Sequence, residues 1–142
     1  KRQWGGKLIL KGIMDVEDAK LAVASGADAI IVSNHGGRQL DGADSSIHAL
    51  PAIVEAVGQA IEVHLDGGIR SGQDVLKAWA LGARGTYIGR AMVYGLGAMG
   101  EAGVTKALEI IHKELDVTMA FCGHIDIRNV DRGILLPGSF PV

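Results

Sequence analysis

Apolar and polar positions follow two different patterns along the chain. Four short apolar runs are predicted to be buried strands, namely 8–10, 29–33, 61–65 and 86–88. Apolar residues at helical spacing follow each run and predict helices over 15–25, 45–58, 71–82, 91–96 and 102–121. Residues 135–142 contain prolines and a glycine and are expected to form an irregular tail. This order of elements indicates the α/β fold class with a parallel sheet.

The strand–helix unit is repeated along the chain. Residues of the first helical segment recur 56 positions later in the third: Asp18 and Asp74, Ala22 and Ala78, Ala24 and Ala80, Gly26 and Gly82, Ala27 and Ala83. Strands about 20 to 35 residues apart fit a (β/α)8 TIM barrel, which needs eight strands to close. We therefore expect residues 1–142 to be the C-terminal half of such a barrel, supplying strands 5–8 and the C-terminal helices. The N-terminal half would be a missing segment or a separate chain.

The composition is that of a globular protein, with 48% hydrophobic and 21% charged residues. A formal net charge of −2 provides no overall positive field for nucleic acid, so no nucleic-acid partner is expected. The single cysteine, Cys122, excludes an intrachain disulfide and a multi-cysteine zinc site, and we expect no metal. No apolar run approaches the roughly 18–20 residues that span a bilayer. We expect a cytoplasmic protein, or one peripheral to the inner membrane.

Glycines and arginines follow the last two predicted strands. Gly67, Gly68 and Gly89 leave backbone N–H groups accessible to a ligand, and Arg70 and Arg90 add guanidinium groups suited to phosphate oxygens. The helices that begin after these loops add positive N-terminal dipoles. Phosphate is commonly held by the loops after strands 7 and 8 of a TIM barrel. These loops predict a phosphate site; turns with solvated arginines are the alternative.

The loop after the second predicted strand has the residue types of a catalytic site. Ser33 and His35 are two positions apart, so both side chains point the same way if the strand continues that far. His35 is a candidate base near neutral pH, and Arg38 can bind a carboxylate with two hydrogen bonds. Lys11, after the first strand, can stabilise negative charge on an electron-accepting cofactor. The alternatives are a structural histidine and a surface lysine.

Residues 33–42 read Ser-Asn-His-Gly-Gly-Arg-Gln-Leu-Asp-Gly. This segment resembles the FMN-dependent L-2-hydroxy acid oxidases and dehydrogenases, which include glycolate oxidase, lactate oxidase, L-lactate dehydrogenase and mandelate dehydrogenase. The likeness extends from Lys7 to about Asp131, and the motifs at 66–70 and 89–90 occur in the expected order. Glycine–arginine loops are shared with other phosphate-binding barrels, whereas the 33–42 segment is more specific.

The resemblance implies FMN as cofactor and a small L-2-hydroxy acid of the lactate, glycolate or mandelate class as substrate. His35 would contact the substrate and remove a proton from it, and Arg38 would bind its carboxylate. No residue decides whether the substrate carbon loses a hydride or a proton. The implied FMN contacts are Lys11, Ser33, Asp66, Gly67, Gly68, Arg70, Gly89 and Arg90. A homotetramer or a larger oligomer is also implied.

Two other functions stay open. The chain could be part of another FMN barrel, such as an isomerase or a nucleotide dehydrogenase, although residues 34–41 argue against that. It could also be a non-catalytic half-barrel fragment that binds flavin or phosphate, or an interaction module. Neither the electron acceptor nor the individual hydroxy acid can be read from these residues.

Overall fold

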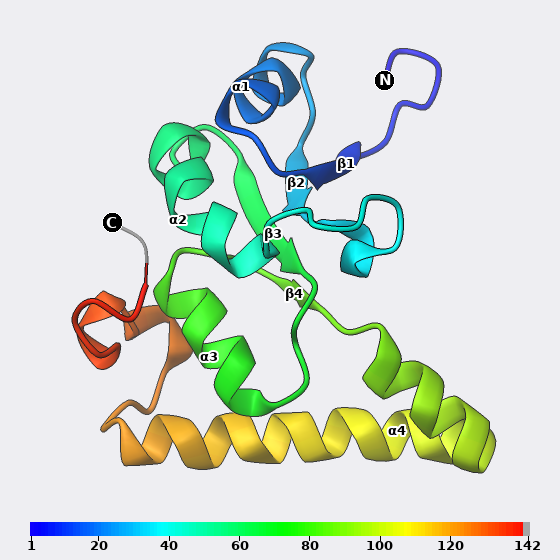
Figure 1. Cartoon of the computed structure of the whole chain (residues 1–142), viewed down its shortest axis with the longest axis vertical. Helices are drawn as coiled ribbons and strands as arrows, with labels where there is room; N and C mark the ends of the chain where they lie inside the picture. Colours follow the sequence, from blue (N-terminus) through cyan, green and yellow to red (C-terminus); the bar gives the residue numbers. More distant parts are fainter. Residues whose placement is uncertain (141–142) are drawn as a thin grey trace.

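A parallel β-sheet forms the centre of the molecule. The computed structural model describes residues 1–140. Within them the strands are β1 (Ile9–Ile13), β2 (Ala29–Val32), β3 (Glu62–Asp66) and β4 (Thr86–Tyr87). They are hydrogen-bonded in the order β1-β2-β3-β4 (Figure 1). Every neighbouring pair is parallel, which confirms the fold class that the hydrophobic pattern predicts.

Helices connect the strands and follow the last one. They are α1 (Val16–Ala24), α2 (Ser46–Val57), α3 (Gly72–Ala80) and α4 (Arg90–Phe121). Short 3-10 turns, which the sequence pattern does not indicate, are η1 (His35–Gly37), η2 (Ile127–Asn129) and η3 (Arg132–Ile134). The tail has no helix or strand over residues 135–140, as predicted, and residues 141–142 lie outside the described part. No helix in residues 1–140 is long and apolar enough to cross a membrane.

The bend in α4 divides it into two helical segments. Gly100 interrupts the helix with φ 62° and ψ −140°. Gly95 and Gly103 bring the two segments together, because a Cβ at Gly103 would lie 1.8 Å from the carbonyl oxygen of Gly95. The helix runs past Leu96 to the bend at Gly100, so the predicted end at Leu96 is wrong. Gly100 has a positive φ and Gly97 does not, so the bend lies at Gly100.

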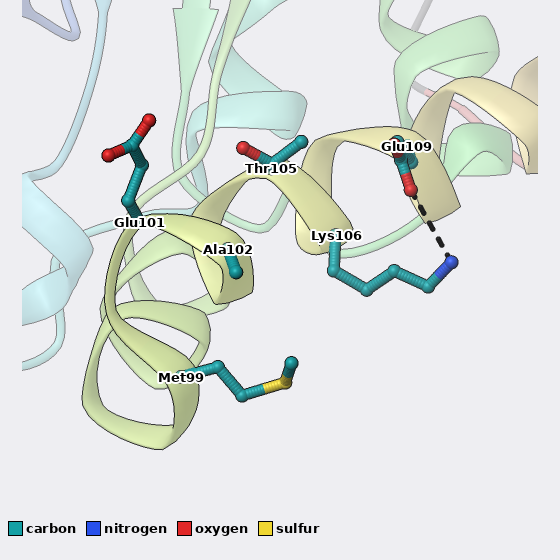
Figure 2. Close-up of a pocket in the computed structure, with 6 residues that line it drawn as sticks. All are labelled: Met99, Glu101, Ala102, Thr105, Lys106 and Glu109. Carbon is teal, nitrogen blue, oxygen red and sulfur yellow. Dashed lines mark hydrogen bonds and ion pairs between the residues drawn. The ribbon is translucent and has the colours of Figure 1, made fainter.

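A shallow hollow of about 700 Å³ lies at this bend (Figure 2). It is lined by Met99, Glu101, Ala102, Thr105, Lys106 and Glu109. Lys106 and Glu109 form an ion pair of 3.4 Å across its rim, and both side chains are more than 60% exposed. None of the predicted site residues lies in this hollow.

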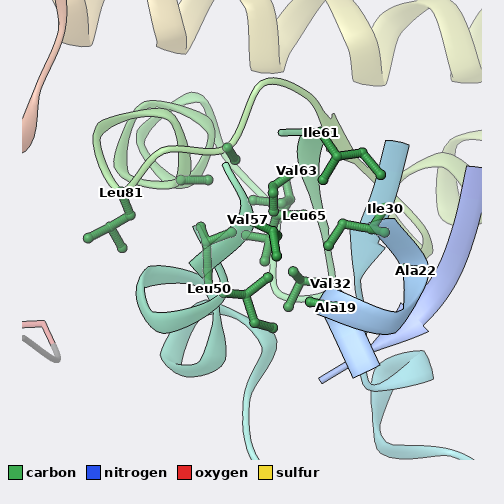
Figure 3. Close-up of a cluster of buried hydrophobic side chains, with 14 residues drawn as sticks. Ala19, Ala22, Ile30, Val32, Leu50, Val57, Ile61, Val63, Leu65 and Leu81 are labelled. Carbon is green, nitrogen blue, oxygen red and sulfur yellow. The ribbon is translucent and has the colours of Figure 1, made fainter. Parts of the chain in front are cut away.

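One face of the sheet packs against α1, α2 and α3 (Figures 1 and 3). Ile30 and Val32 of β2 and Val63 and Leu65 of β3 are at most 1% exposed. The helices contribute the side chains packed with them: Ala19, Ala22, Leu50, Ile53, Val57, Ala78 and the adjoining Leu81. Fully burying one such aliphatic side chain contributes about 1.5–3 kcal/mol, so this layer is a major source of favourable folding free energy.

The opposite face of the sheet is mixed, because strand side chains alternate between faces and Ile9, Ala29 and Ile31 lie there beside Lys11, Glu62 and His64. His64 lies there with its Nδ1 3.1 Å from the Tyr87 hydroxyl and its Nε2 3.2 Å from the Glu62 carboxylate. Ile9 and Tyr87, on the two outer strands, are 45% and 38% exposed. A four-stranded sheet with two outer edges and a partly exposed second face has the form expected of part of a barrel.

The start of α3 lies directly against the backbone of α4. The N–H of Gly72 donates to a carboxylate oxygen of Glu114 at 2.9 Å. A Cβ at Gly72 would lie 1.9 Å from the backbone nitrogen of Leu115, so no larger residue fits without moving one helix.

We predict that Gly72→Ala lowers the free energy of unfolding by at least about 2 kcal/mol, because overpacking a close contact costs about 1–3 kcal/mol. Gly97→Ala is the matched control, since it is also a helical glycine and a Cβ there would meet no atom within 4 Å. That control is expected to be neutral or stabilising by up to about 1 kcal/mol. Urea unfolding of both variants measures the difference, and equal stabilities would contradict the prediction.

Candidate functional site

A cleft of about 1190 Å³ lies at the C-terminal ends of the strands. The predicted site residues that line it are Lys11, His35, Arg38, Asp66, Gly67, Gly68, Arg70, Gly89 and Arg90. Ser33 is the remaining predicted site residue and lies beneath the cleft floor, 1% exposed. The fold therefore brings together residues that are up to 79 positions apart in the sequence. Small-molecule sites typically occupy roughly 300–1,000 Å³, so the cleft has room for a cofactor and a small substrate.

Residues of β1 and β3 and the residue directly after β2 form one hydrogen-bonded network at the floor of the cleft. The Ser33 hydroxyl donates to a carboxylate oxygen of Asp66 at 2.6 Å and accepts from the Lys11 ammonium at 3.1 Å. Lys11 and the same Asp66 oxygen form an ion pair of 2.8 Å. Lys11 lies within β1, not after it, so the prediction that the first strand ends at this residue is wrong. The strand continues to Ile13 because Gly12, with φ +96°, allows a bulge between Lys11 and Ile13.

This network determines the ionisation of Asp66. Burial raises the pKa of the Asp66 carboxyl, whereas the hydrogen bonds from Lys11 and Ser33 lower it. The hydrogen bonds and the positive charge of Lys11 outweigh burial, so the pKa of Asp66 lies below its ordinary value. Asp66 is therefore a carboxylate at neutral pH, and it neutralises the nearby ammonium group.

His35 lies at the cleft in an uncommon backbone conformation. Strand β2 ends at Val32 and η1 begins at His35, so the condition under which Ser33 and His35 share a strand face is not met. His35 has φ +56°, the only positive φ among non-glycine residues of the described chain. Its backbone N–H donates to the Ser33 hydroxyl at 3.1 Å. Non-glycine residues with this φ are uncommon and often mark functional sites.

The His35 ring packs over bare backbone of the neighbouring strand. A Cβ at Gly12 would lie 2.7 Å from Cε1 of the imidazole, so only glycine leaves room for the ring. Sequence reasoning missed this role of Gly12. The only signal available was a single glycine between Lys11 and Ile13, and a glycine within a strand is typical of a bulge or of a close approach between chains.

Three guanidinium groups surround the cleft without carboxylate partners. Arg38, Arg70 and Arg90 all line it and are exposed. Within residues 1–140, none of the three forms an ion pair. Because Lys11 is neutralised by Asp66, these arginines give the cleft its net positive charge. Guanidinium groups bind phosphate and carboxylate with paired hydrogen bonds, so the arrangement suits a ligand with several anionic groups.

The glycine loops leave backbone accessible beside the arginines. A Cβ at Gly68 or Gly89 would meet no atom within 4 Å, so both residues border open space. Gly89 precedes α4 and provides no side-chain capping bond, which leaves the N–H groups of that helix start available to an anion. The start of α3 differs from the prediction, because Asp74 and Glu114 already accept hydrogen bonds there. Only one of the two expected helix dipoles is therefore available.

Two aromatic side chains complete the cleft. Tyr87 of β4 and Tyr94 of α4 line it, together with Val93. The sequence pattern assigns Tyr87 to a strand and Tyr94 to a helix without a site role. Both side chains line the cleft because α4 follows β4 directly and its first segment begins at the cleft.

A parallel α/β sheet with a cationic cleft at its C-terminal strand ends is the arrangement with which α/β barrel proteins commonly hold phosphate groups. Comparison with known proteins identifies the family to which the chain belongs. The family model described as FMN-dependent dehydrogenase matches residues 1–137, and the chain belongs to this family of FMN-containing oxidoreductases.

The relatives are much longer than this chain. An L-lactate dehydrogenase of Caulobacter vibrioides is 56% identical over 132 residues, which are 93% of this chain and 34% of that protein. A pre-mycofactocin synthase of Mycobacterium tuberculosis is 52% identical over 138 residues, or 96% of this chain and 35% of that protein. A crystal structure of mandelate oxidase with a fluorinated hydroxy acid superposes with a TM-score of 0.87 and 48% identity, covering 90% of this chain and 39% of that one. The chain thus spans about a third of the length of the curated relatives.

The chemistry of the cleft fits FMN, the cofactor of this family. FMN carries a phosphate dianion and a flavin ring that becomes negatively charged on reduction. The guanidinium groups and open backbone around Gly89 suit the phosphate, and the ammonium of Lys11 suits a negatively charged ring. No steric obstacle stands beside Gly68 or Gly89.

We predict that the Asp66 network makes the chain's stability depend on acid pH. Because the folded pKa of Asp66 is lowered, its stabilisation is present above the unfolded value of about 3.9 and is lost as pH falls through the folded value. Asp66→Asn should therefore lose less stability than the wild type between pH 7 and pH 3. Urea unfolding at several pH values measures this difference.

Lys11→Met is a second test of the network formed by Lys11, Ser33 and Asp66, because it removes the cation that lowers the pKa of Asp66. Exposed Asp41, in the loop after η1, supplies the control Asp41→Asn. Parallel pH profiles for the wild type and Asp66→Asn would show that the network does not contribute.

Proposed function

We propose that this chain carries the catalytic base and the phosphate site of an FMN-dependent enzyme that oxidises an L-2-hydroxy acid to the 2-oxo acid. The observation that carries the proposal is the convergence on one cleft of one imidazole and three guanidinium groups that form no ion pair within residues 1–140. Lactate, glycolate and mandelate are the candidate substrate classes. Relatives named L-lactate dehydrogenase and mandelate oxidase support this choice.

The positive groups divide between cofactor and substrate by position. Arg70 and Arg90, with Gly67, Gly68 and Gly89, would hold the FMN phosphate. Lys11 and Asp66, with Ser33 beneath them, would lie along the flavin and its ribityl chain. Since Ser33 already bonds both neighbours, it would act there mainly by fixing their positions. Arg38 would then remain for the carboxylate of the substrate.

FMN, when bound, would accept the two electrons and one of the two protons that the hydroxy acid loses on conversion to the oxo acid, which leaves one proton for the base. Arg38 binds the substrate carboxylate and so places C2 and its hydroxyl beside His35. The His35 imidazole accepts a proton from the substrate, and it is well placed because its ring lies at the cleft surface over Gly12. The residual positive charge of the cleft favours the anionic substrate and the negative charge that develops during the reaction.

We propose that residues 1–142 form the C-terminal half of a TIM barrel, with strands β1 to β4 as barrel strands 5–8. The outer strands and the partly exposed second face of the sheet would pack against the N-terminal half of the same barrel, which activity would require. The relatives, nearly three times as long, support this assignment. A cytoplasmic homotetramer or larger oligomer is the proposed assembly.

His35→Ala, made in the full-length polypeptide that contains this chain, is expected to lower kcat by about 10²–10⁴-fold, the usual contribution of a general base. FMN binding should persist, because the imidazole is proposed to contact the substrate and not the FMN phosphate. Bleaching of the flavin absorption by L-lactate, glycolate or L-mandelate provides the measurement.

Arg38→Lys is the companion variant, expected mainly to raise KM because an ammonium cannot form the paired hydrogen bonds to a carboxylate. His112→Ala, on the distant part of α4, is the control. Unchanged turnover in His35→Ala would remove the proposed base. A flavin that no hydroxy acid bleaches would favour another kind of FMN barrel.

Arg70→Ala and Arg90→Ala are each expected to weaken FMN binding by about tenfold or more, since a hydrogen bond to a charged group contributes about 1.5–3 kcal/mol. Riboflavin, which lacks the phosphate, should bind both variants and the wild type equally. Flavin fluorescence titration distinguishes the two ligands, with Arg84→Ala as the control because Arg84 is exposed and lies beside Trp79. Equal losses for FMN and riboflavin would contradict a phosphate site.

A further inference from the structure

Asn34 makes hydrogen bonds to both ends of the loop that carries Arg38. Its Oδ1 accepts from the backbone N–H of Gly36 at 2.9 Å, and its Nδ2 donates to the backbone carbonyl of Asp44 at 3.0 Å. The backbone carbonyl oxygen of Asn34 also accepts from the N–H of Gly37 at 3.0 Å. One half-buried side chain thus spans the loop from residue 36 to residue 44.

The same side chain borders the phosphate-side loop. A Cβ at Gly67 would lie 3.4 Å from Oδ1 of Asn34, so the amide stands against that backbone. Asn34 consequently lies between two loops of the cleft. A rigid side chain at this place limits how the His35 loop can move relative to the neighbouring strand.

His35 requires such support because of its backbone. A φ of +56° is unfavourable for a residue with a Cβ and persists only when surrounding contacts maintain it. The Ser33 hydroxyl holds the N–H of His35, and Asn34 holds the next N–H along the chain, that of Gly36. Relaxation of His35 to a negative φ would turn its imidazole away from Gly12.

We infer that Asn34 is a positioning residue with two separable tasks. Its Oδ1 maintains the left-handed backbone of His35, and its Nδ2 closes the loop that presents Arg38. The inference rests on the proposed roles of His35 and Arg38. In this role the Asn34 side chain contacts neither substrate nor cofactor.

The two hydrogen bonds can be removed separately in the full-length flavoenzyme. Asn34→Ala loses both. Asn34→Ser keeps a neutral acceptor for the N–H of Gly36, because serine forms the same kind of turn more weakly, but it cannot reach the Asp44 carbonyl. His48→Ala is the matched control, because it removes the side-chain partner of Asp44 while leaving both bonds of Asn34 in place.

Asn34→Ala is expected to lower kcat by about 100-fold, the effect of displacing a reacting group by about 1 Å, and to raise KM by about tenfold. Asn34→Ser should recover most of kcat while KM stays raised. His48→Ala should match the wild type in both constants. This separation of kcat from KM would not arise from a general loss of folded enzyme.

A second measurement does not depend on activity. Trypsin cleavage after Arg38, followed by mass spectrometry, should be at least about tenfold faster in Asn34→Ala and Asn34→Ser than in the wild type, because local opening exposes the loop. The FMN absorption spectrum and the unfolding midpoint should stay near those of the wild type.

The outcomes separate this inference from the proposed function. Wild-type kcat and KM in Asn34→Ala, together with unchanged cleavage after Arg38, would overturn the positioning role. Equal loss of kcat in the alanine and serine variants would overturn the division into two tasks. If His35→Ala keeps full activity, the proposed base fails, while faster cleavage in the Asn34 variants would still show that the amide closes the loop.

Discussion

A single buried hydroxyl, that of Ser33, holds the site together. It accepts hydrogen bonds from Lys11 and from the backbone of His35, and it donates to Asp66. These partners come from three adjacent strands or the loops after them, so the hydroxyl aligns their C-terminal ends. Because Ser33 is 1% exposed, water does not compete for these bonds. The apolar layer beneath α1, α2 and α3 holds the strands in register, and the hydroxyl orients the polar groups above them.

The charges of the cleft are arranged in two groups. Asp66 cancels the charge of Lys11 at the floor, where the two form a close ion pair. Arg38, Arg70 and Arg90 at the rim have no such partners among residues 1–140, so the rim is positive while the floor is neutral. The positive rim therefore attracts an anionic ligand. The position that the ligand then takes above the floor determines which of its atoms lie near Lys11 and His35.

The parallel sheet, its helices and the gathering of strand-end residues could be predicted from the sequence, because apolar periodicity and glycine–arginine loops are local signals. The conformation of His35 and the bulge at Gly12 could not, because each depends on contacts between residues distant in sequence. Glu114 at the start of α3 is a similar case, since it comes from a helix more than forty residues away. Asn34 carried a local signal, a short polar side chain before two glycines, yet its bond to Asp44 closes a loop that sequence spacing alone does not reveal.

The close contact between the imidazole of His35 and the backbone of Gly12 has a consequence for how this fold can diversify. Gly12 directly follows Lys11, so the cationic side chain and the bare surface under the ring belong to one short stretch of β1. A residue larger than glycine at position 12 would displace the His35 ring, so this stretch leaves little freedom to reshape the cleft. Tyr94 lines the cleft from α4 and is 70% exposed. A substitution on α4 can therefore change the shape of the cleft with less disturbance than a substitution at Gly12.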